Sequence, residues 1–195
     1  MNFLGHIYLS NNDPKIMVGN FIGDFVKGRN FSDRFEPEIG RGIALHRLID
    51  EYTDKHPMVQ QSKNKLRHKY RHYAPVIVDI FYDHFLSKHW KDYHAIPLPV
   101  YAQTAYTIIE AHRSILPLGV NRMLPYMIKD NWLLNYGNLQ GIGQALTGIS
   151  RRTQYDSKMD ESIHELKVFY DEFNDEFKSF IPDAKSHADE FLKTS

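Results

Sequence analysis

The sequence predicts an all-α fold, a single-domain helical bundle that spans residues 1–195. Apolar residues recur mostly at three- and four-residue spacing, and no clear run alternates with period two. The chain shows no internal repeat, no low-complexity tract and no linker. Its 195 residues are enough for one domain with a sizeable core.

Caps and prolines divide the chain into helices. The first helix is expected to begin at Asp13-Pro14, with Asp13 as N-cap, and to end near Gly28. The second runs from about Pro37 to His56, where Pro57 forces a break or a kink. Further helices are expected over residues 58–72, 75–94, 100–116, 121–136, 160–180 and 182–192, with a glycine-rich helix or pair of turns at 137–152.

Composition excludes several classes of function. The formal net charge is zero, from 24 basic and 24 acidic residues, which argues against a general nucleic-acid-binding protein. Cysteine is absent, so any metal site must use nitrogen and oxygen ligands. No stretch reads as a signal peptide or a membrane span, so we expect a cytoplasmic protein without a membrane contact. The oligomeric state is not predicted by any feature.

Carboxylates and histidines interrupt the apolar faces of two predicted helices. His46 and Asp50 lie four residues apart, and so do Asp79 and Asp83, which places each pair on one helical face. His84 follows Asp83 directly. Buried carboxylates are costly unless something compensates their charge. A divalent cation would do so.

The first helix contributes a further carboxylate, Asp24. Gly19 and Gly23 remove side chains from one side of that helix, so another helix or a ligand can approach closely there. If the three helices pack together, their carboxylates and imidazoles converge on one site inside the bundle. Such mixed ligands suit Mn²⁺, Fe²⁺, Mg²⁺ or Zn²⁺.

Each of these residues also has a plainer interpretation. His46 alone could be a hydrogen-bonded core histidine, and Asp50 or Asp83 could form an ion pair with Arg47 or Lys88. The metal-site hypothesis therefore depends on the residues occurring together.

The run KNKLRHKYRH, residues 63–72, concentrates basic residues in a chain of zero net charge. On a helix, Lys63, Arg67 and Arg71 would share one face. This face is either a solvated surface or a docking patch for an acidic partner.

Four blocks in order, MNFLGHIYLS, GNFIGDFVKG, GIALHRLIDEYTDKHP and APVIVDIFYDHFLSKHW, resemble the acyl carrier protein phosphodiesterases. The blocks span residues 1–90. That family is regarded as a divergent branch of the HD-domain metal-dependent phosphohydrolases, and the resemblance implies an all-helical fold and a divalent cation, typically manganese. The implied reaction releases 4′-phosphopantetheine from the serine of holo-acyl carrier protein.

The resemblance also implies a set of site residues. They are Asp24, His46, Asp50, Asp79, Asp83 and His84, with His6 as a weaker candidate. One departure from the HD pattern is that Arg47, rather than aspartate, follows His46. We expect Asp24, His46, Asp50 and Asp79 to bind metal, with Asp83 completing the site. His46 or His84 would supply the proton for the leaving serine.

Two alternatives remain open at the level of sequence. The chain could be an HD-like phosphohydrolase that acts on a nucleotide or another small phosphodiester. It could also be a non-catalytic helical protein that binds an acidic partner, with its aspartates in structural ion pairs.

Overall fold

The computed structural model describes residues 1–28, 30–31 and 33–194 and confirms the all-α class. Helices and turns account for the regular structure of these residues, and none of them is in a strand. No helix in the described ranges is long and apolar enough to cross a bilayer. The helices are α1 (Phe3–Tyr8), α2 (Pro14–Ile22), η1 (Gly23–Phe25), α3 (Pro37–Lys55), α4 (Pro57–Tyr70), η2 (Arg71–Tyr73), α5 (Ala74–Lys88), α6 (Trp90–Tyr93), α7 (Leu98–Ala111), η3 (Arg113–Ile115), α8 (Leu118–Lys129), α9 (Trp132–Asn135), α10 (Leu139–Ser150), η4 (Met159–Ser162), α11 (Ile163–Val168) and α12 (Tyr170–Thr194).

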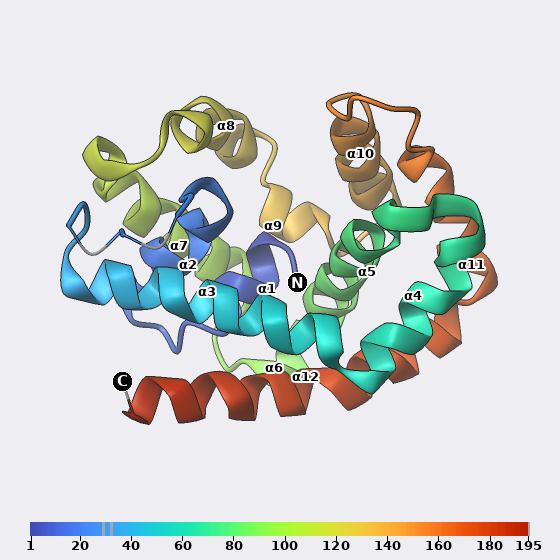
Figure 1. Ribbon diagram of the computed structural model, residues 1–195, viewed down its shortest axis with the longest axis horizontal. Coiled ribbons are helices and arrows are strands. Elements are labelled where there is room, and N and C mark those ends of the chain that lie inside the picture. Colours follow the sequence, from blue (N-terminus) through green and yellow to red (C-terminus); the bar gives the residue numbers. More distant parts are fainter. Residues whose placement is uncertain (29, 32, 195) are drawn as a thin grey trace.

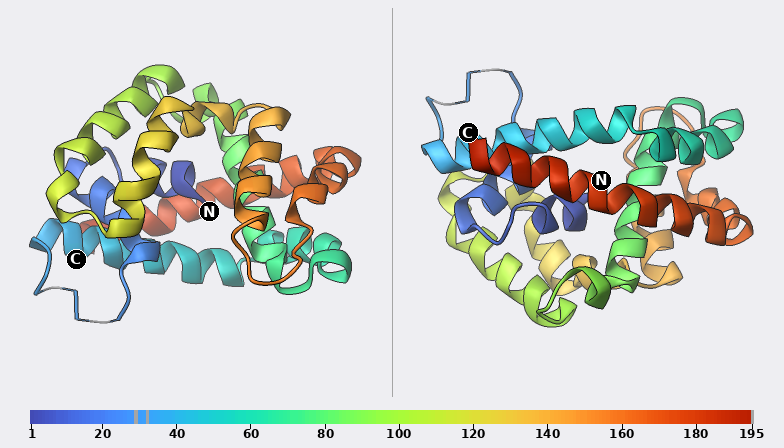
Figure 2. Two further views of the ribbon diagram at one scale, coloured as in Figure 1. Left: turned by 90° about the horizontal axis from the view of Figure 1, so that it is seen from above. Right: turned by 90° about the horizontal axis from the view of Figure 1, so that it is seen from below.

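The long helices α3, α4 and α12 form the base of the molecule. Helix α12 runs beneath α3 and α4, and α5 rises from the end of α4 (Figures 1 and 2). Helices α8 and α10 stand apart on the opposite side, with α1, α2 and α9 between them and the base (Figure 1). This arrangement leaves the centre of one face to α1, η1, α3 and the start of α5.

Helices α2 and α3 cross at very short range because glycines face each other. A Cβ atom at Gly19 would lie 2.0 Å from the carbonyl oxygen of Ile39, and one at Gly42 would lie 2.3 Å from that of Ile16. The sequence left open whether a helix or a ligand approaches Gly19 and Gly23. The structure shows that α3 does.

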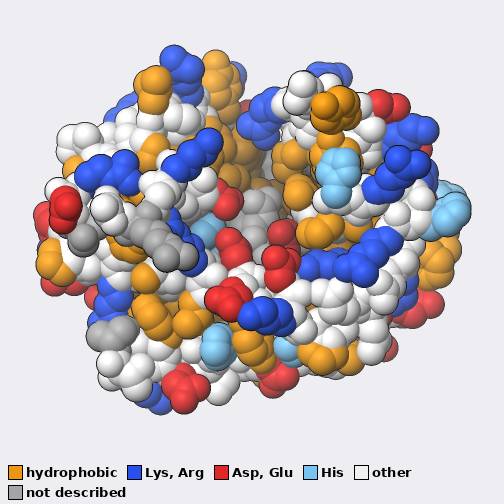
Figure 3. Space-filling model, in the orientation of Figure 1, with side chains coloured by type: hydrophobic (Ala, Val, Ile, Leu, Met, Phe, Trp, Pro, Cys, Tyr) orange, Lys and Arg blue, Asp and Glu red, His pale blue; other side chains and the backbone are white. Residues whose placement is uncertain are grey.

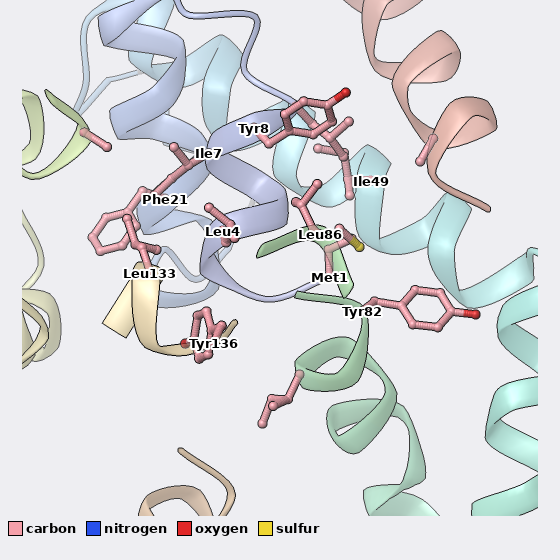
Figure 4. Close-up of a cluster of buried hydrophobic side chains, with 14 of the residues drawn as sticks. Met1, Leu4, Ile7, Tyr8, Phe21, Ile49, Tyr82, Leu86, Leu133 and Tyr136 are labelled. Atoms are coloured by element: carbon pink, nitrogen blue, oxygen red, sulfur yellow. The ribbon is translucent and has the colours of Figure 1, made fainter. Parts of the chain in front are cut away.

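One hydrophobic core joins the N-terminal helices to the rest of the molecule. Leu4 and Ile7 of α1 are fully buried beside Phe21 of α2 and Leu133 of α9 (Figure 4). On its other side the cluster continues through Met1 and Ile49 to Leu86 and Tyr82 of α5 (Figure 4). Burial of this apolar surface fixes α1 between α2 and α5.

Some predicted boundaries are confirmed and others differ. The predicted helices 75–94, 121–136 and 160–180 are each divided, into α5 and α6, into α8 and α9, and into η4, α11 and the start of α12. Asp13 caps α2 through the N–H groups of Lys15 and Ile16, and Pro57 separates α3 from α4. However, α1 was not expected, and the first predicted helix ends at Ile22 with a 3₁₀ turn after it. Pro182 lies within α12 instead of starting a new helix, because buried residues on both sides hold α12 against the core.

Candidate metal centre and active-site cavity

Two histidines from different helices stack against each other at the centre of the site. His6 of α1 and His46 of α3 have ring centroids 3.9 Å apart and planes 18° from parallel. Both side chains are buried. Gly23 makes room for the second ring, because a Cβ atom there would lie 2.2 Å from Cγ of His46.

Asn20 of α2 holds both imidazoles by their Nδ1 atoms. His46 Nδ1 lies 2.7 Å from the backbone oxygen of Asn20, and His6 Nδ1 lies 2.8 Å from its side-chain Oδ1. The Asn20 amide nitrogen donates to the carbonyl of His6 and to Ser10 Oγ, so its Oδ1 accepts. Each Nδ1 therefore donates a proton, so when either ring is neutral its lone pair is on Nε2, on the other side of the ring.

Two carboxylates lie where the Nε2 atoms point. Asp50 is one turn after His46 on α3, and its two oxygens lie 3.2 Å from His6 Nε2 and 3.2 Å from His46 Nε2. Asp24 Oδ1, on η1, is also 3.2 Å from His46 Nε2. The predicted i, i+4 arrangement of His46 and Asp50 is thus present in the structure.

The electrostatics of this cluster favour a bound cation. Burial opposes the charged form of His46, but hydrogen bonds to Asp24 and Asp50 outweigh it and raise the pKa of His46 to about 9. Burial and the neighbouring charge of His46 lower the pKa of His6. The pKa of Asp24 is lowered by its hydrogen bond to His46. Without a metal, Asp24 and Asp50 therefore stabilise a proton on Nε2 of His46. A metal ion bound to this nitrogen would take the place of that proton.

The donor set fits a divalent metal. One ligand atom each from His6, His46 and Asp50 lies within 4.8 Å of the others. A histidine that binds metal through one nitrogen usually donates a hydrogen bond from the N–H of its other nitrogen to a carbonyl or carboxylate. Both rings do this here toward oxygens of Asn20. Imidazole and carboxylate ligands suit Mn²⁺, Fe²⁺, Mg²⁺ and Zn²⁺ alike.

The cluster opens onto a cavity of about 400 Å³. Asp24, Asp50 and Asp79 line it, together with Thr53 and Asp54. Figure 3 shows this hollow between α8 and α10, with acidic side chains gathered along its lower edge above α3. The buried hydroxyl of Thr53 has no hydrogen-bond partner among the described residues.

Asp79 and Asp83 both bond to the N-terminal segment of the chain. Asp79 Oδ1 accepts a hydrogen bond of 2.8 Å from the α-amino group of Met1. Asp83 is fully buried and accepts from the backbone N–H groups of Asn2, Leu4 and Gly5, which caps α1. Burial raises the pKa of Asp83 to about 7, against the opposing effect of the Met1 ammonium group and these N–H groups. Asp83 thus positions α1 and does not line the cavity.

His84 also lies away from the cluster. Its Nδ1 donates to the carbonyl of Tyr136 at 2.8 Å, and its Nε2 accepts from the hydroxyl of Tyr170 at 2.8 Å. Both ring nitrogens are therefore engaged in joining α5 to other helices, and His84 does not line the cavity. Its expected role as a proton donor to the leaving group finds no support in this placement.

The three predicted docking residues differ in exposure. Lys63 is buried, and its Nζ lies 2.7 Å from Asp54 Oδ1. Arg67 is exposed and bonds only to the neutral side chains of Asn64 and Gln60. Arg71 is exposed on η2. Lys63 therefore supports the cavity wall, while the two arginines face solvent.

Sequence reasoning gave too little weight to His6 and missed Asn20. His6 lies in GHIYLS, before the first predicted helix, and Asn20 lies in GNFIGD, within that helix. The available signal was a histidine inside an otherwise apolar block, Leu4 to Leu9. No periodic pattern marks Asn20, whose role depends on the crossing of α1, α2 and α3.

The chain resembles proteins of one family over nearly its whole length. The family described as acyl carrier protein phosphodiesterase matches residues 1–184. A protein of that name from Photorhabdus laumondii is 33% identical over 183 residues, which cover 93% of this chain and 92% of the relative. One from Escherichia coli O6:H1 is 34% identical over 186 residues, covering 93% and 94%. No solved structure matches the chain, so the predicted likeness to the HD-domain fold stays a prediction.

Proposed function

The chain belongs to the acyl carrier protein phosphodiesterase family, and we propose that it is a metal-dependent enzyme that releases 4′-phosphopantetheine from holo-acyl carrier protein. The family resemblance predicted from the sequence is thereby confirmed. The observation that carries the metal dependence is the cluster of His6, His46 and Asp50 at the end of an acidic cavity. The proposal includes a cytoplasmic location, where a carrier protein would meet the enzyme.

His6, His46 and Asp50 hold the metal in this proposal, and Asp24 completes the site from η1. A bound divalent ion would lower the pKa of a water molecule and polarise a phosphoryl oxygen. Manganese is the ion that the family resemblance implies, and Mg²⁺, Fe²⁺ or Zn²⁺ would suit the same ligands. Asp79 lies further along the cavity wall and would act on the substrate side of the site.

The reaction adds water to phosphorus and breaks its bond to the serine oxygen. Asp24, whose pKa is held low by its hydrogen bond to His46, is ionised at neutral pH and can therefore serve as a metal ligand. The proton that water loses is matched by the one that the serine oxygen gains, which gives apo-carrier protein and free 4′-phosphopantetheine.

An acidic carrier protein would dock beside the cavity through exposed basic residues. Arg71 lies on η2, and the next helix in the chain supplies Pro75 and Val76 to the cavity wall. Figure 3 shows Lys and Arg side chains on both sides of the hollow. In this proposal Arg67 and Arg71 contact the carrier protein, and Lys63 acts indirectly by holding Asp54.

The proposal is tested by mass spectrometry of holo-acyl carrier protein incubated with the enzyme and Mn²⁺. We expect the mass of phosphopantetheine to be lost, and the loss to be abolished by chelator and by Asp50→Asn. Glu51→Gln is the matched control, because Glu51 is an exposed carboxylate on the same helix that pairs only with Lys55. An unchanged carrier mass with metal-loaded enzyme would overturn the proposed substrate. Activity of Asp50→Asn equal to that of the control would overturn the proposed metal centre.

A further inference from the structure

A second cavity adjoins the acidic one. Its volume is about 750 Å³, and it lies between α8, α9 and α10. The two cavities are adjacent, because they share the lining residues Asn2, Phe3, Ile149 and Arg152. In Figure 3 the hollow extends from the acidic edge toward α8 and α10, where apolar side chains line it.

Apolar and amide side chains make up much of the lining of this second cavity. Trp132, Ala145 and Ile149 supply the apolar surface. Asn131, Asn135 and Gln144 supply amides. Its volume is within the range of about 300–1,000 Å³ that is usual for small-molecule sites. Lys129, Asp130 and Arg152 add charged groups to the lining. Its apolar and amide part suits a flexible ligand that carries amides and methyl groups.

Arg152 stands at the junction of the two cavities. Its Nε donates to the carbonyl of Gly148 at 3.0 Å, which leaves its terminal nitrogens for other partners. No described carboxylate forms an ion pair with it. A guanidinium group in this position matches a phosphate that lies between the acidic site and the second cavity.

We propose that the second cavity binds the pantetheine arm of the substrate, with Arg152 on its phosphate. This inference rests on the proposed function and adds the part of the enzyme that recognises the substrate. The esterified pantetheine arm has two amides, one free hydroxyl, a terminal thiol and a pair of geminal methyl groups, and its amides and methyl groups match the amide and apolar lining. The carrier protein itself is far too large for the cavity and would remain outside it.

Gly148 offers a way to fill the cavity without disturbing the fold. It lines the cavity from α10, and a Cβ atom there meets no other atom within 4 Å. Gly148→Phe would place a ring in the space assigned to the arm. Ala145→Leu is a second filling variant on the same wall. Gln140→Phe is the matched control, since Gln140 is exposed on α10 and lies outside the cavity lining.

The experiment measures binding of pantetheine and of 4′-phosphopantetheine to the manganese-loaded protein by isothermal titration calorimetry. We expect both filling variants to weaken both ligands by about tenfold or more, equivalent to about 1.4 kcal/mol. We expect Arg152→Gln to weaken only the phosphorylated ligand, and Gln140→Phe to bind like the unchanged protein. Manganese affinity, measured in parallel, shows whether each variant has kept its metal centre.

The outcomes separate this inference from the proposed function. If the protein binds neither ligand, or if both filling variants bind them with unchanged affinity, the cavity does not hold the arm. If holo-carrier protein is hydrolysed with an unchanged KM by Gly148→Phe, the function stands and the cavity assignment fails. If both ligands bind as expected and holo-carrier protein is not hydrolysed, the cavity assignment stands and the proposed reaction fails.

Discussion

Asn20 is the residue on which the geometry of the histidine pair depends. It holds the Nδ1 atoms of His6 and His46 with two different oxygens, and its amide nitrogen also bonds to the loop after α1. Its side chain is fully buried. Because the tautomer of each ring follows from these bonds, Asn20 determines which nitrogen lone pairs point at Asp50.

Replacing Asn20 with alanine should weaken metal binding by about 10- to 100-fold, as is typical when a group that orients a metal ligand is lost. The variant should also lose about 1–3 kcal/mol of stability, since buried polar partners are left unpaired. Metal titration and urea unfolding in the presence of chelator measure the two effects. Asn64→Ala is the control on an exposed asparagine within α4. Metal affinity equal to that of the control would show that the histidines need no such support.

At the scale of elements, α5 is tied to its neighbours by two buried side chains that sequence reasoning placed at the metal. Asp83 caps α1, and His84 joins α5 to the end of α9 and to α12. Lys88 donates to the Tyr170 hydroxyl at 2.7 Å, and that hydroxyl donates to His84. Burial lowers the pKa of His84 to about 4, and the positive charge of nearby Lys88 contributes in the same direction.

This low pKa predicts a loss of stability in acid. A histidine whose pKa is about 4 when folded and near 6.5 when unfolded stabilises the fold fully above pH 6.5. The contribution disappears as the pH falls toward 4, by up to about 3 kcal/mol. Urea unfolding between pH 4 and 8 should show this slope in the unchanged chain and a shallower one in His84→Gln. His72→Gln, at an exposed histidine, should keep the original slope. Equal slopes in all three proteins would contradict the prediction.

Part of the fold and of the candidate site could be predicted from the sequence. Periodicity, caps and prolines were sufficient for the helical class and for α3 and α4, because these signals are local. The pairing of His46 with Asp50 was predictable from i, i+4 spacing for the same reason. The hydrogen-bond partners of Asp83 and His84 could not be predicted in this way, because those partners lie on helices that are distant in the sequence. A buried carboxylate needs compensation, but spacing alone does not tell a metal from a helix N-terminus.

At the scale of the whole molecule, zero net charge conceals an uneven distribution. Carboxylates gather in the central hollow while Lys and Arg side chains surround it (Figure 3). A cation is attracted to the interior of the hollow and an acidic protein to its rim. The composition gives only the sum of these charges, whereas the fold separates them in space. Lys63 shows that helical spacing alone does not tell which basic residues are exposed. Spacing grouped it with Arg67, but its side chain is buried and paired with Asp54.

Reversing the charge of the rim should therefore slow the encounter with an acidic carrier protein and spare the metal centre. The double variant Arg67→Glu, Arg71→Glu should raise KM for holo-acyl carrier protein by about tenfold or more at low salt, through lost electrostatic complementarity. The effect should shrink as added salt screens exposed charges. Steady-state kinetics from low to high ionic strength measure it, beside manganese affinity, which should not change.

A second double variant separates docking from net charge. Lys91→Glu, Lys178→Glu changes the total charge by the same amount at exposed positions on α6 and α12, which contribute nothing to either cavity. These helices lie at the base of the molecule (Figure 1). If this control raises KM as much as the arginine variant does, the net charge of the enzyme attracts the carrier protein, and Arg67 and Arg71 are not its specific docking site. If only the arginine variant responds, and its response is lost at high salt, the carrier protein docks on the α4–η2 side of the cavity.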